Sequence, residues 1–381
     1  MLVKYLRTLS TRALVALAAV VALLAVGGTA IAIAATGGSG PVPASKPLPS
    51  ALHEGLAATK PAGITARIRF TNGLLPSGAL LGQVGSALMS GASGRLWMRD
   101  DGRGRLELQS NAGDVQVVWK RGRATVYDAS SNTVYRIALP AGQPQARHAP
   151  PSVAGIGAFL AQLTKHVNVS SAKPSSVGGR PAYTVQLSPK EAGGLLGSVR
   201  LAWDATRGVP LRAAIYARGG TKPVLELQAT RVRYGPVPLS TVAIAPPAGA
   251  RVVDLAAPSG HERGKSEARP TKLPFQVVAP RSLAGLQHSV TRVVGHGPHR
   301  GALLVYGEGL GAITVLEREA GAGSGAAQLK ALPTVPLDGV EGHELATPLA
   351  TILTWDRGGL TYVLAGSVKP SVAESAARSL R

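Results

Sequence analysis

Residues 94–137 read GRLWMRDDGRGRLELQSNAGDVQVVWKRGRATVYDASSNTVYRI. Apolar and polar residues alternate through this stretch, as in Leu96 and Met98 or Val115 and Val117. The sequences Asp-Asp-Gly, Asn-Ala-Gly, Lys-Arg-Gly and Ser-Ser-Asn interrupt the runs and are typical of tight turns. The pattern predicts an antiparallel meander with one buried and one solvated face.

The segments on either side extend this sheet. Residues 64–72 alternate in the same way and predict a strand with a basic outer face. Ser50 is expected to cap a short helix before that strand. After the meander, five apolar residues share one face of a predicted helix: Val153, Ile156, Phe159, Leu160 and Leu163. Further strands are expected at 166–173, 181–187, 198–204, 209–217, 224–234 and 239–245.

Residues 73–93, between the first strand and the meander, form an apolar and Gly-rich excursion. It carries Leu74, Leu75, Leu80, Leu81, Val84, Leu88 and Met89. Seven large apolar side chains in such a loop are unusual for a segment in solvent, so we expect the excursion to cover the sheet. It is interpreted as either a lid or mouth of a binding cavity or a simple plug.

Charge and composition limit the possible partners. The chain has 41 Lys and Arg against 20 Asp and Glu, and three of the basic residues, Lys4, Arg7 and Arg12, lie in the first twelve positions. The remaining excess favours anionic headgroups, acidic polymers or an acidic protein. An ordinary basic composition explains it equally well. Because the charges are scattered and lack an aromatic-rich motif, nucleic acid is not predicted as a partner.

The chain is expected to act outside the cytoplasm. Residues 1–12 form a basic tail, and residues 13–35 are an uncharged apolar run long enough to span a membrane. This run predicts either a single-pass anchor in the cytoplasmic membrane or, since Ala32-Ile33-Ala34 resembles a cleavage site, a secretory signal. With no Cys in the chain, disulfides and thiolate metal sites are excluded.

Changes in composition divide the remainder into two predicted domains. Residues 36–50 are a Gly/Pro/Ser linker, 51–255 a first domain, 256–272 a polar linker and 273–381 a second, α+β domain. In the second domain, strands are expected at 275–279, 289–295, 302–306, 312–318 and 360–365, with further strand structure in 343–354. An Ala-rich helix after Pro370 is expected to end this domain.

The order of these elements resembles the LolA/RseB superfamily over residues 52–254. The sharpest points of the resemblance are Val126-Tyr127-Asp128 and the phrase from Trp203-Asp204 to Pro210-Leu211-Arg212. The resemblance implies an α+β fold, a curved, half-open antiparallel β-barrel with covering helices, which binds lipid or lipoprotein acyl chains. RseB-like members also bind a membrane anti-sigma factor. A membrane anchor and an extra domain depart from the soluble carriers, which favours a tethered receptor or sensor over a shuttle.

An acyl-chain site needs a dry concavity and no catalytic group. The predicted cavity and cover residues are Phe70, Leu80, Leu81, Val84, Leu88, Met98, Trp119, Ile156, Phe159, Leu160 and Leu163. Each is also explained as ordinary core. His296 and His299 lack further ligands for a metal, and Gly307, Gly309 and Gly311 are interpreted as a hairpin turn and not as a nucleotide loop.

Three functions are therefore weighed. The first is a membrane-tethered binding protein for lipid or lipoprotein acyl chains, and the second is a regulatory module for an anti-sigma factor or another envelope protein. The third is an envelope hydrolase, which no pairing of acids or nucleophiles supports. The sequence thus predicts no enzyme, no cofactor and no metal.

Overall fold

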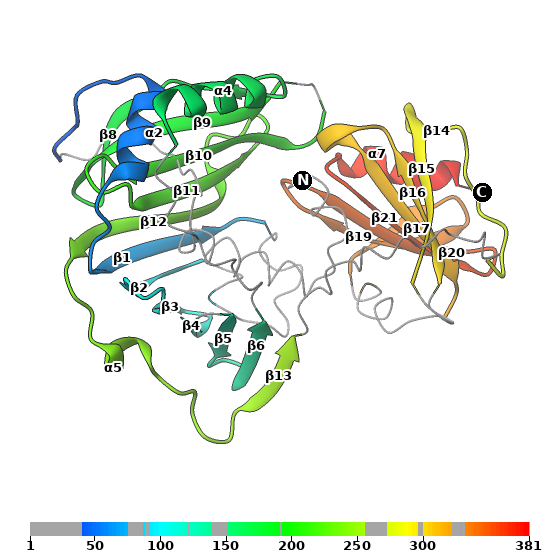
Figure 1. The fold of residues 1–381 in the computed structure, drawn as a ribbon. Helices are drawn as coiled ribbons and strands as arrows, with labels where there is room; N and C mark the ends of the chain where they lie inside the picture. Colours follow the sequence, from blue (N-terminus) through cyan, green and yellow to red (C-terminus); the bar gives the residue numbers. More distant parts are fainter. Residues whose placement is uncertain are drawn as a thin grey trace. The chain divides into compact units, whose positions relative to one another are not determined.

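A computed structural model gives the fold of this chain (Figure 1). It describes residues 40–74, 87, 91–120, 122–138, 151–190, 193–255, 273–295, 300–321, 329 and 332–380. These residues form two compact units, each with its own sheet and core. The domain boundaries at 255 and 273 stay predictions.

The first unit contains a single sheet. Its strands are β1 (Gly63–Asn72), β2 (Ala92–Arg99), β3 (Gly104–Ser110), β4 (Gly113–Lys120), β5 (Arg123–Asp128), β6 (Thr133–Ala138), β7 (Val167–Val169), β8 (Lys173–Val177), β9 (Arg180–Pro189), β10 (Leu196–Asp204), β11 (Pro210–Ala217), β12 (Pro223–Tyr234) and β13 (Arg251–Leu255). These strands pair antiparallel, except for the edge strand β13, which pairs in parallel with β6. Figure 1 shows this sheet curled into an open half-barrel. The predicted fold class, α+β with a curved half-open barrel, is confirmed.

Strand order explains how the half-barrel is assembled. The order is β13-β6-β5-β4-β3-β2-β1-β12-β11-β10-β9-β7, and β8 pairs with β9 beside this path. The meander β2 to β6 is the local hairpin series that its turn residues predict. Strand β1 lies between β2 and β12, so the first strand of the chain joins the meander to the later strands.

Two helices cover one end of this sheet. Helix α2 (Leu48–Ala57) and helix α4 (Val153–Leu163) contact each other and lie beside β9 in Figure 1. Helix α4 begins after Ser152, whose Oγ accepts a hydrogen bond from the Gly155 amide, the usual cap for a helix start. Between β12 and β13 a short helix, α5 (Leu239–Val242), contacts β2 and β3.

The second unit is an eight-stranded antiparallel sheet with one terminal helix. Its strands are β14 (Ser282–Leu283), β15 (Leu286–Val294), β16 (Gly301–Tyr306), β17 (Ile313–Glu319), β18 (Thr334–Leu337), β19 (Val340–Ala346), β20 (Thr351–Arg357) and β21 (Leu360–Gly366). Helix α7 (Pro370–Ser379) packs Ala373, Ala376 and Ala377 onto this sheet. The predicted terminal helix is thereby confirmed.

Several predicted elements are wrong, mostly next to proline. Residues 239–245 contain helix α5 in place of a strand, because Pro238 leads into a helical turn. Residues 275–279 lie outside any strand, since Pro274 and Pro280 flank them and cannot donate to a sheet ladder. The first helix begins at Leu48, so Ser50 lies inside it. The single strand expected at 166–173 is replaced by the short strand β7 and, after a break, the start of β8 at Lys173.

Candidate ligand-binding face of the first sheet

The inner face of the first sheet consists of apolar rows that cross six neighbouring strands. One row runs Ile64, Met98, Gly104, Trp119, Ala124 and Ile137, as the pairing register shows. The next row runs Ala66, Leu96, Leu106, Val117, Val126 and Tyr135. Directly opposite residues on one face are the contacts that stabilise a sheet. The meander therefore presents a continuous apolar surface on this side.

The apolar excursion contributes a buried alanine to this surface. Ala87 is fully buried, and it belongs to the same core cluster as Leu106, Val117 and Trp119. An alanine within residues 73–93 therefore contacts the inner face, as expected of a segment that covers the sheet. Leu80, Leu81, Val84 and Leu88 lie outside the described residues, so their role stays a prediction.

The structure brings together the three predicted site residues that lie on strands. Trp119 is a buried member of the inner cluster, and Phe70 and Met98 are partly buried against it. Phe70 is paired with Leu227 of β12, and Met98 with Ile64 of β1. These residues share one face because each occupies an alternate position of its strand.

The helical site residues lie on the other side of the sheet. Ile156 and Leu160 belong to a separate cluster with Tyr183 and Trp203. In β10, Trp203 follows Ala202, which belongs to the inner cluster, and successive side chains of a strand point to opposite faces. Helix α4 therefore does not cover the same face as Ala87.

Phe159 and Leu163 do not enter either core. Phe159 is 58% exposed, although it is one of only three phenylalanines in the chain. Leu163, in the last turn of α4, is half-buried. The apolar side of this helix is thus used in part for packing on α2 and β9, and in part left open to solvent.

The inner face becomes polar at the strands farthest from the meander. Along β9, every second residue after Ala182 is polar and lies on the same side of the sheet as Ala182. These residues are Thr184, Gln186 and Ser188. Arg200 of β10 donates from Nε to Oε1 of Gln186 at 2.9 Å. These side chains line an open cavity of about 430 Å³ together with Asn168, Val169, Ser170 and Lys173. We did not predict this polar end, because isolated polar residues in strands carry no distinct signal.

Asp204 is the best connected carboxylate of the unit and has a structural role. It is fully buried, and Oδ2 accepts hydrogen bonds from Tyr234 at 2.7 Å and Arg180 at 3.1 Å. Its Oδ1 accepts from the amide and the hydroxyl of Thr206 in the turn to β11. Burial alone would raise the pKa of Asp204, but the hydrogen bonds from Tyr234 and Thr206 outweigh it and lower the pKa. The carboxylate is saturated with donors, which leaves it unsuited to acid or base chemistry.

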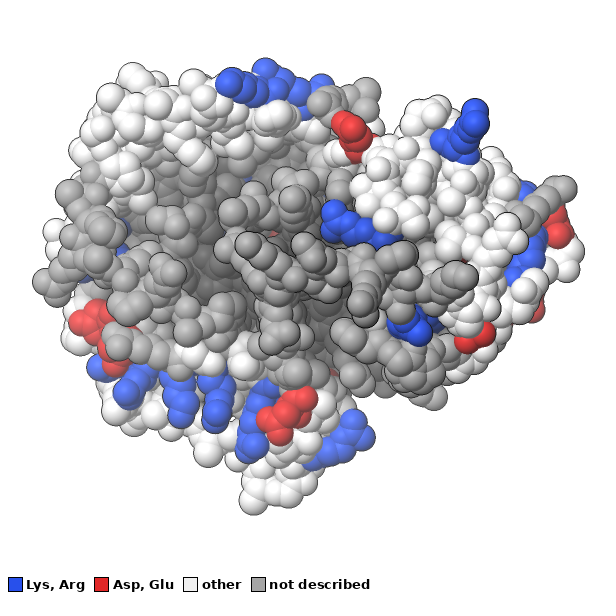
Figure 2. Space-filling model, turned by 45° about the vertical axis from the view of Figure 1, so that its right-hand side comes forward, with Lys and Arg blue, Asp and Glu red and all other residues white. Residues whose placement is uncertain are grey.

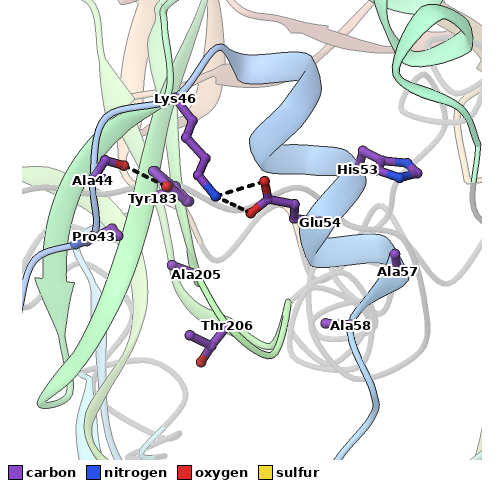
Figure 3. A pocket seen from close by; sticks show the side chains of 10 residues that line it. All are labelled: Pro43, Ala44, Lys46, His53, Glu54, Ala57, Ala58, Tyr183, Ala205 and Thr206. Carbon is purple, nitrogen blue, oxygen red and sulfur yellow. Dashed lines mark hydrogen bonds and ion pairs between the residues drawn. The ribbon is translucent and has the colours of Figure 1, made fainter.

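A second cavity, of about 530 Å³, lies between α2 and strands β9 and β10 (Figure 3). Lys46 and Glu54 face each other across it with a 2.6 Å ion pair, and both are exposed. Tyr183 donates its hydroxyl to the carbonyl of Ala44 at 2.7 Å, and the Thr206 hydroxyl is already bonded to Asp204. The Tyr183 bond ties the segment before α2 to the sheet, the Lys46–Glu54 pair ties it to α2, and the Thr206 hydroxyl is used within the turn after β10. We therefore interpret this open groove as a structural contact region and not as a ligand site.

Within the described residues, no group of three His, Asp or Glu side chains is placed to hold a metal ion. His296 and His299 lie outside those residues. Among the helices that the structure describes, none is both long and apolar enough to cross a membrane. The predicted anchor or signal at 13–35 likewise lies outside the described part of the chain.

Comparison with solved structures finds proteins of the kind that the sequence resembles. A MucA/MucB complex from Pseudomonas aeruginosa matches with 18% identity and a TM-score of 0.43, over 86% of this chain and 95% of that chain. A LolA-superfamily protein from Nitrosomonas europaea matches with 10% identity and a TM-score of 0.23, over 52% of this chain and 99% of that one. No protein-family profile and no curated protein matches the sequence. The likeness to LolA/RseB-type proteins is one of fold.

Proposed function

We propose that this chain is an extracytoplasmic binding protein, tethered by residues 13–35, which holds lipid or lipoprotein acyl chains on the inner face of its half-barrel without catalysing a reaction. The observation that carries the proposal is the continuous apolar face of β1 to β6. Burial of an acyl chain contributes about 0.8 kcal/mol per methylene. A surface of aliphatic and aromatic side chains is therefore enough to hold one.

The polar end of the same face supports an amphipathic ligand. Lys173 and Arg200 supply cationic groups beside the hydroxyls of Thr184 and Ser188. Small-molecule sites combine a mostly apolar lining with a few polar groups that fix orientation. In this proposal Phe70, Met98 and Trp119 contact the acyl chain.

Tryptophan fluorescence tests the proposal, because the unit has tryptophans on two faces. Trp119 lies in the inner cluster, and Trp203 lies in the helix-covered cluster. Fatty acids brominated along the chain quench only nearby tryptophans. We expect quenching of the wild type, loss of most of it in Trp119→Phe and retention in Trp203→Phe. Equal quenching in the two variants, or none in the wild type, would contradict binding at the inner face.

A second candidate is a regulatory module that binds an anti-sigma factor or another envelope protein, and exposed Phe159 favours it. Large aromatic side chains left in solvent are enriched at protein interfaces. A photo-crosslinking residue at position 159, used in intact cells, is expected to capture a membrane signalling protein. If only lipid is captured there, this candidate fails, while the quenching experiment is unaffected.

A further inference from the structure

Five arginines lie together on the outer face of three adjacent strands. They are Arg231 and Arg233 on β12, Arg67 and Arg69 on β1, and Arg95 on β2. The pairing register places Arg67 directly opposite Arg231 on one side and Arg95 on the other. We call these five residues the arginine face. All five side chains are exposed.

Among the described residues, Glu107 of β3, which faces Arg95, is the one acid placed directly opposite a member of the arginine face. No ion pair in this part of the chain includes any of the five. The nearest acids are already engaged, because Glu107 is paired with Arg105 and Glu226 with Arg212. Like charges placed directly opposite in a sheet destabilise it. Arg67, Arg95 and Arg231 therefore repel one another across the three strands, and an anion bound from outside would relieve this repulsion.

The geometry decides which kind of anion fits. The strands β12, β1 and β2 each have a neighbour on both sides, so their backbone has no free edge where an acidic peptide could add as a strand. The arginines are spread over two dimensions, across three strands and along them, and do not form one row. Figure 2 shows basic side chains side by side along the lower side of the first unit, with acidic side chains beside them.

The residue type points to phosphate. All five positions are arginine, whose planar guanidinium binds phosphate through two parallel hydrogen bonds. A two-dimensional grid of such groups matches the phosphates of a lipid surface better than a single flexible chain. We infer that the arginine face docks on the surface of a membrane that contains anionic phospholipids. This inference is independent of what the inner face binds.

The test measures binding of the full chain to vesicles of phosphatidylglycerol and, separately, of phosphatidylcholine. The apolar segment 13–35 contributes to both, so the ratio of the two affinities reports the charges. The variant R67Q/R95Q/R231Q removes the three directly paired arginines. Because a basic residue near an anionic membrane contributes about a fivefold factor in affinity, we expect the ratio to fall on the order of 100-fold at low salt. High salt should reduce the wild-type ratio in the same way.

A matched control removes three exposed cations from the second unit, in R281Q/R292Q/K369Q. It makes the same change in net charge and is expected to keep most of the phosphatidylglycerol preference. Denaturation curves for both variants check folding, and the arginine-face variant should be at least as stable as the wild type. An equal loss in both variants, or an unchanged ratio in the first, would overturn the inference. So would a variant that keeps its lipid preference but loses binding to polyglutamate, because the face would then serve an acidic polypeptide.

Discussion

Trp119 lies over Gly104, its direct partner on the neighbouring strand, so that the indole ring fills the space where a side chain at position 104 would project. A glycine in the middle of a strand usually weakens it, and here it makes room for the largest residue of the inner face. The two positions act as one packing unit.

The substitution Gly104→Ala should therefore destabilise the first unit. The added methyl group meets the Trp119 ring, and overpacking of this kind costs about 1–3 kcal/mol. Urea denaturation followed by circular dichroism measures the change. Gly157→Ala is the control, because a Cβ at this position of α4 has no neighbour within 4 Å, and alanine favours a helix by roughly 0.5–1 kcal/mol. Equal effects of the two substitutions would contradict the packing relationship.

Removal of the Asp204 carboxylate should be among the most damaging single changes to the first unit. Asp204→Ala leaves the Tyr234 hydroxyl and the Thr206 amide without their acceptor, which costs on the order of 2–4 kcal/mol. Asp101→Ala is the matched control, since Asp101 makes surface ion pairs with Arg99 and Arg103 and accepts one exposed hydrogen bond from the Arg103 amide, and its loss should change stability by less than about 1 kcal/mol. Both values come from urea denaturation near neutral pH.

Acid should weaken the same unit through Asp204. Its folded pKa lies below the ordinary value of 3.8, so its contribution is present above that value and is lost as the pH falls through the folded pKa. In Asp204→Asn this part of the acid sensitivity should disappear. An unchanged acid transition in the variant would show that other carboxylates control it.

The second unit should instead lose stability as the pH rises. Glu317 is fully buried in β17, where Oε2 accepts a hydrogen bond from the Val278 amide, and burial raises the pKa of this carboxyl to about 7. The stabilisation is complete below the unfolded pKa of 4.5, and it decreases as the pH rises through the folded pKa near 7. The total loss across this range is about 2–4 kcal/mol.

Amide hydrogen exchange of β17 and β21 between pH 5 and 8, corrected for the intrinsic exchange rate, measures this loss. Glu317→Gln should remove the pH dependence and make the second unit more stable than the wild type at pH 8. The control Glu319→Gln changes an exposed carboxylate two residues along the same strand and should keep the wild-type profile. If both variants behave alike, Glu317 is not the titrating group.

Loss of the Ser152 cap should lower the stability of the first unit by a smaller amount, and the change tests whether this hydrogen bond fixes the start of α4. Ser152→Ala removes the acceptor for the Gly155 amide and should cost about 1 kcal/mol, whereas Ser152→Asn keeps an acceptor and should change little. Hydrogen exchange of residues 153–163 reports local fraying directly. Similar protection in both variants would show that packing on α2 alone fixes the helix start.

Local patterns explain what could be predicted of this fold. The meander follows from alternation and turn residues that are neighbours in sequence, and Gly102 and Asn132 adopt the positive φ angles that such turns require. Helix α4 follows from apolar spacing. Its packing partner could not be predicted, because each face of β9 and β10 carries apolar residues, Ala182 and Ala202 on one side and Tyr183 and Trp203 on the other.

The sequence predicts the basic outer face of residues 64–72, but it does not predict which distant strands lie beside it. The arginine face depends on the register between β12 and β1, whose residues lie far apart in the chain. The burial of Glu317 depends on Val278 and Tyr306, and a lone Glu in an alternating strand otherwise reads as a solvated position. The two wrong strands lie next to prolines. Apolar alternation at 239–245 and 275–279 favours a strand, but Pro238 leads into helix α5, and Pro274 and Pro280 cannot donate to a sheet ladder.

The position of β13 has a consequence for how the chain folds during synthesis. Arg251 to Leu255 of β13 pair in parallel with Thr133 to Ile137 of β6, and β1 pairs with β12. Neither pairing can form until more than a hundred further residues have emerged from the ribosome. Folds rich in such distant contacts form slowly. The sheet formed by β1 and the meander must therefore wait with both of its outer strands, β1 and β6, unpaired on one side, and this interval is when we expect the nascent chain to depend most on chaperones.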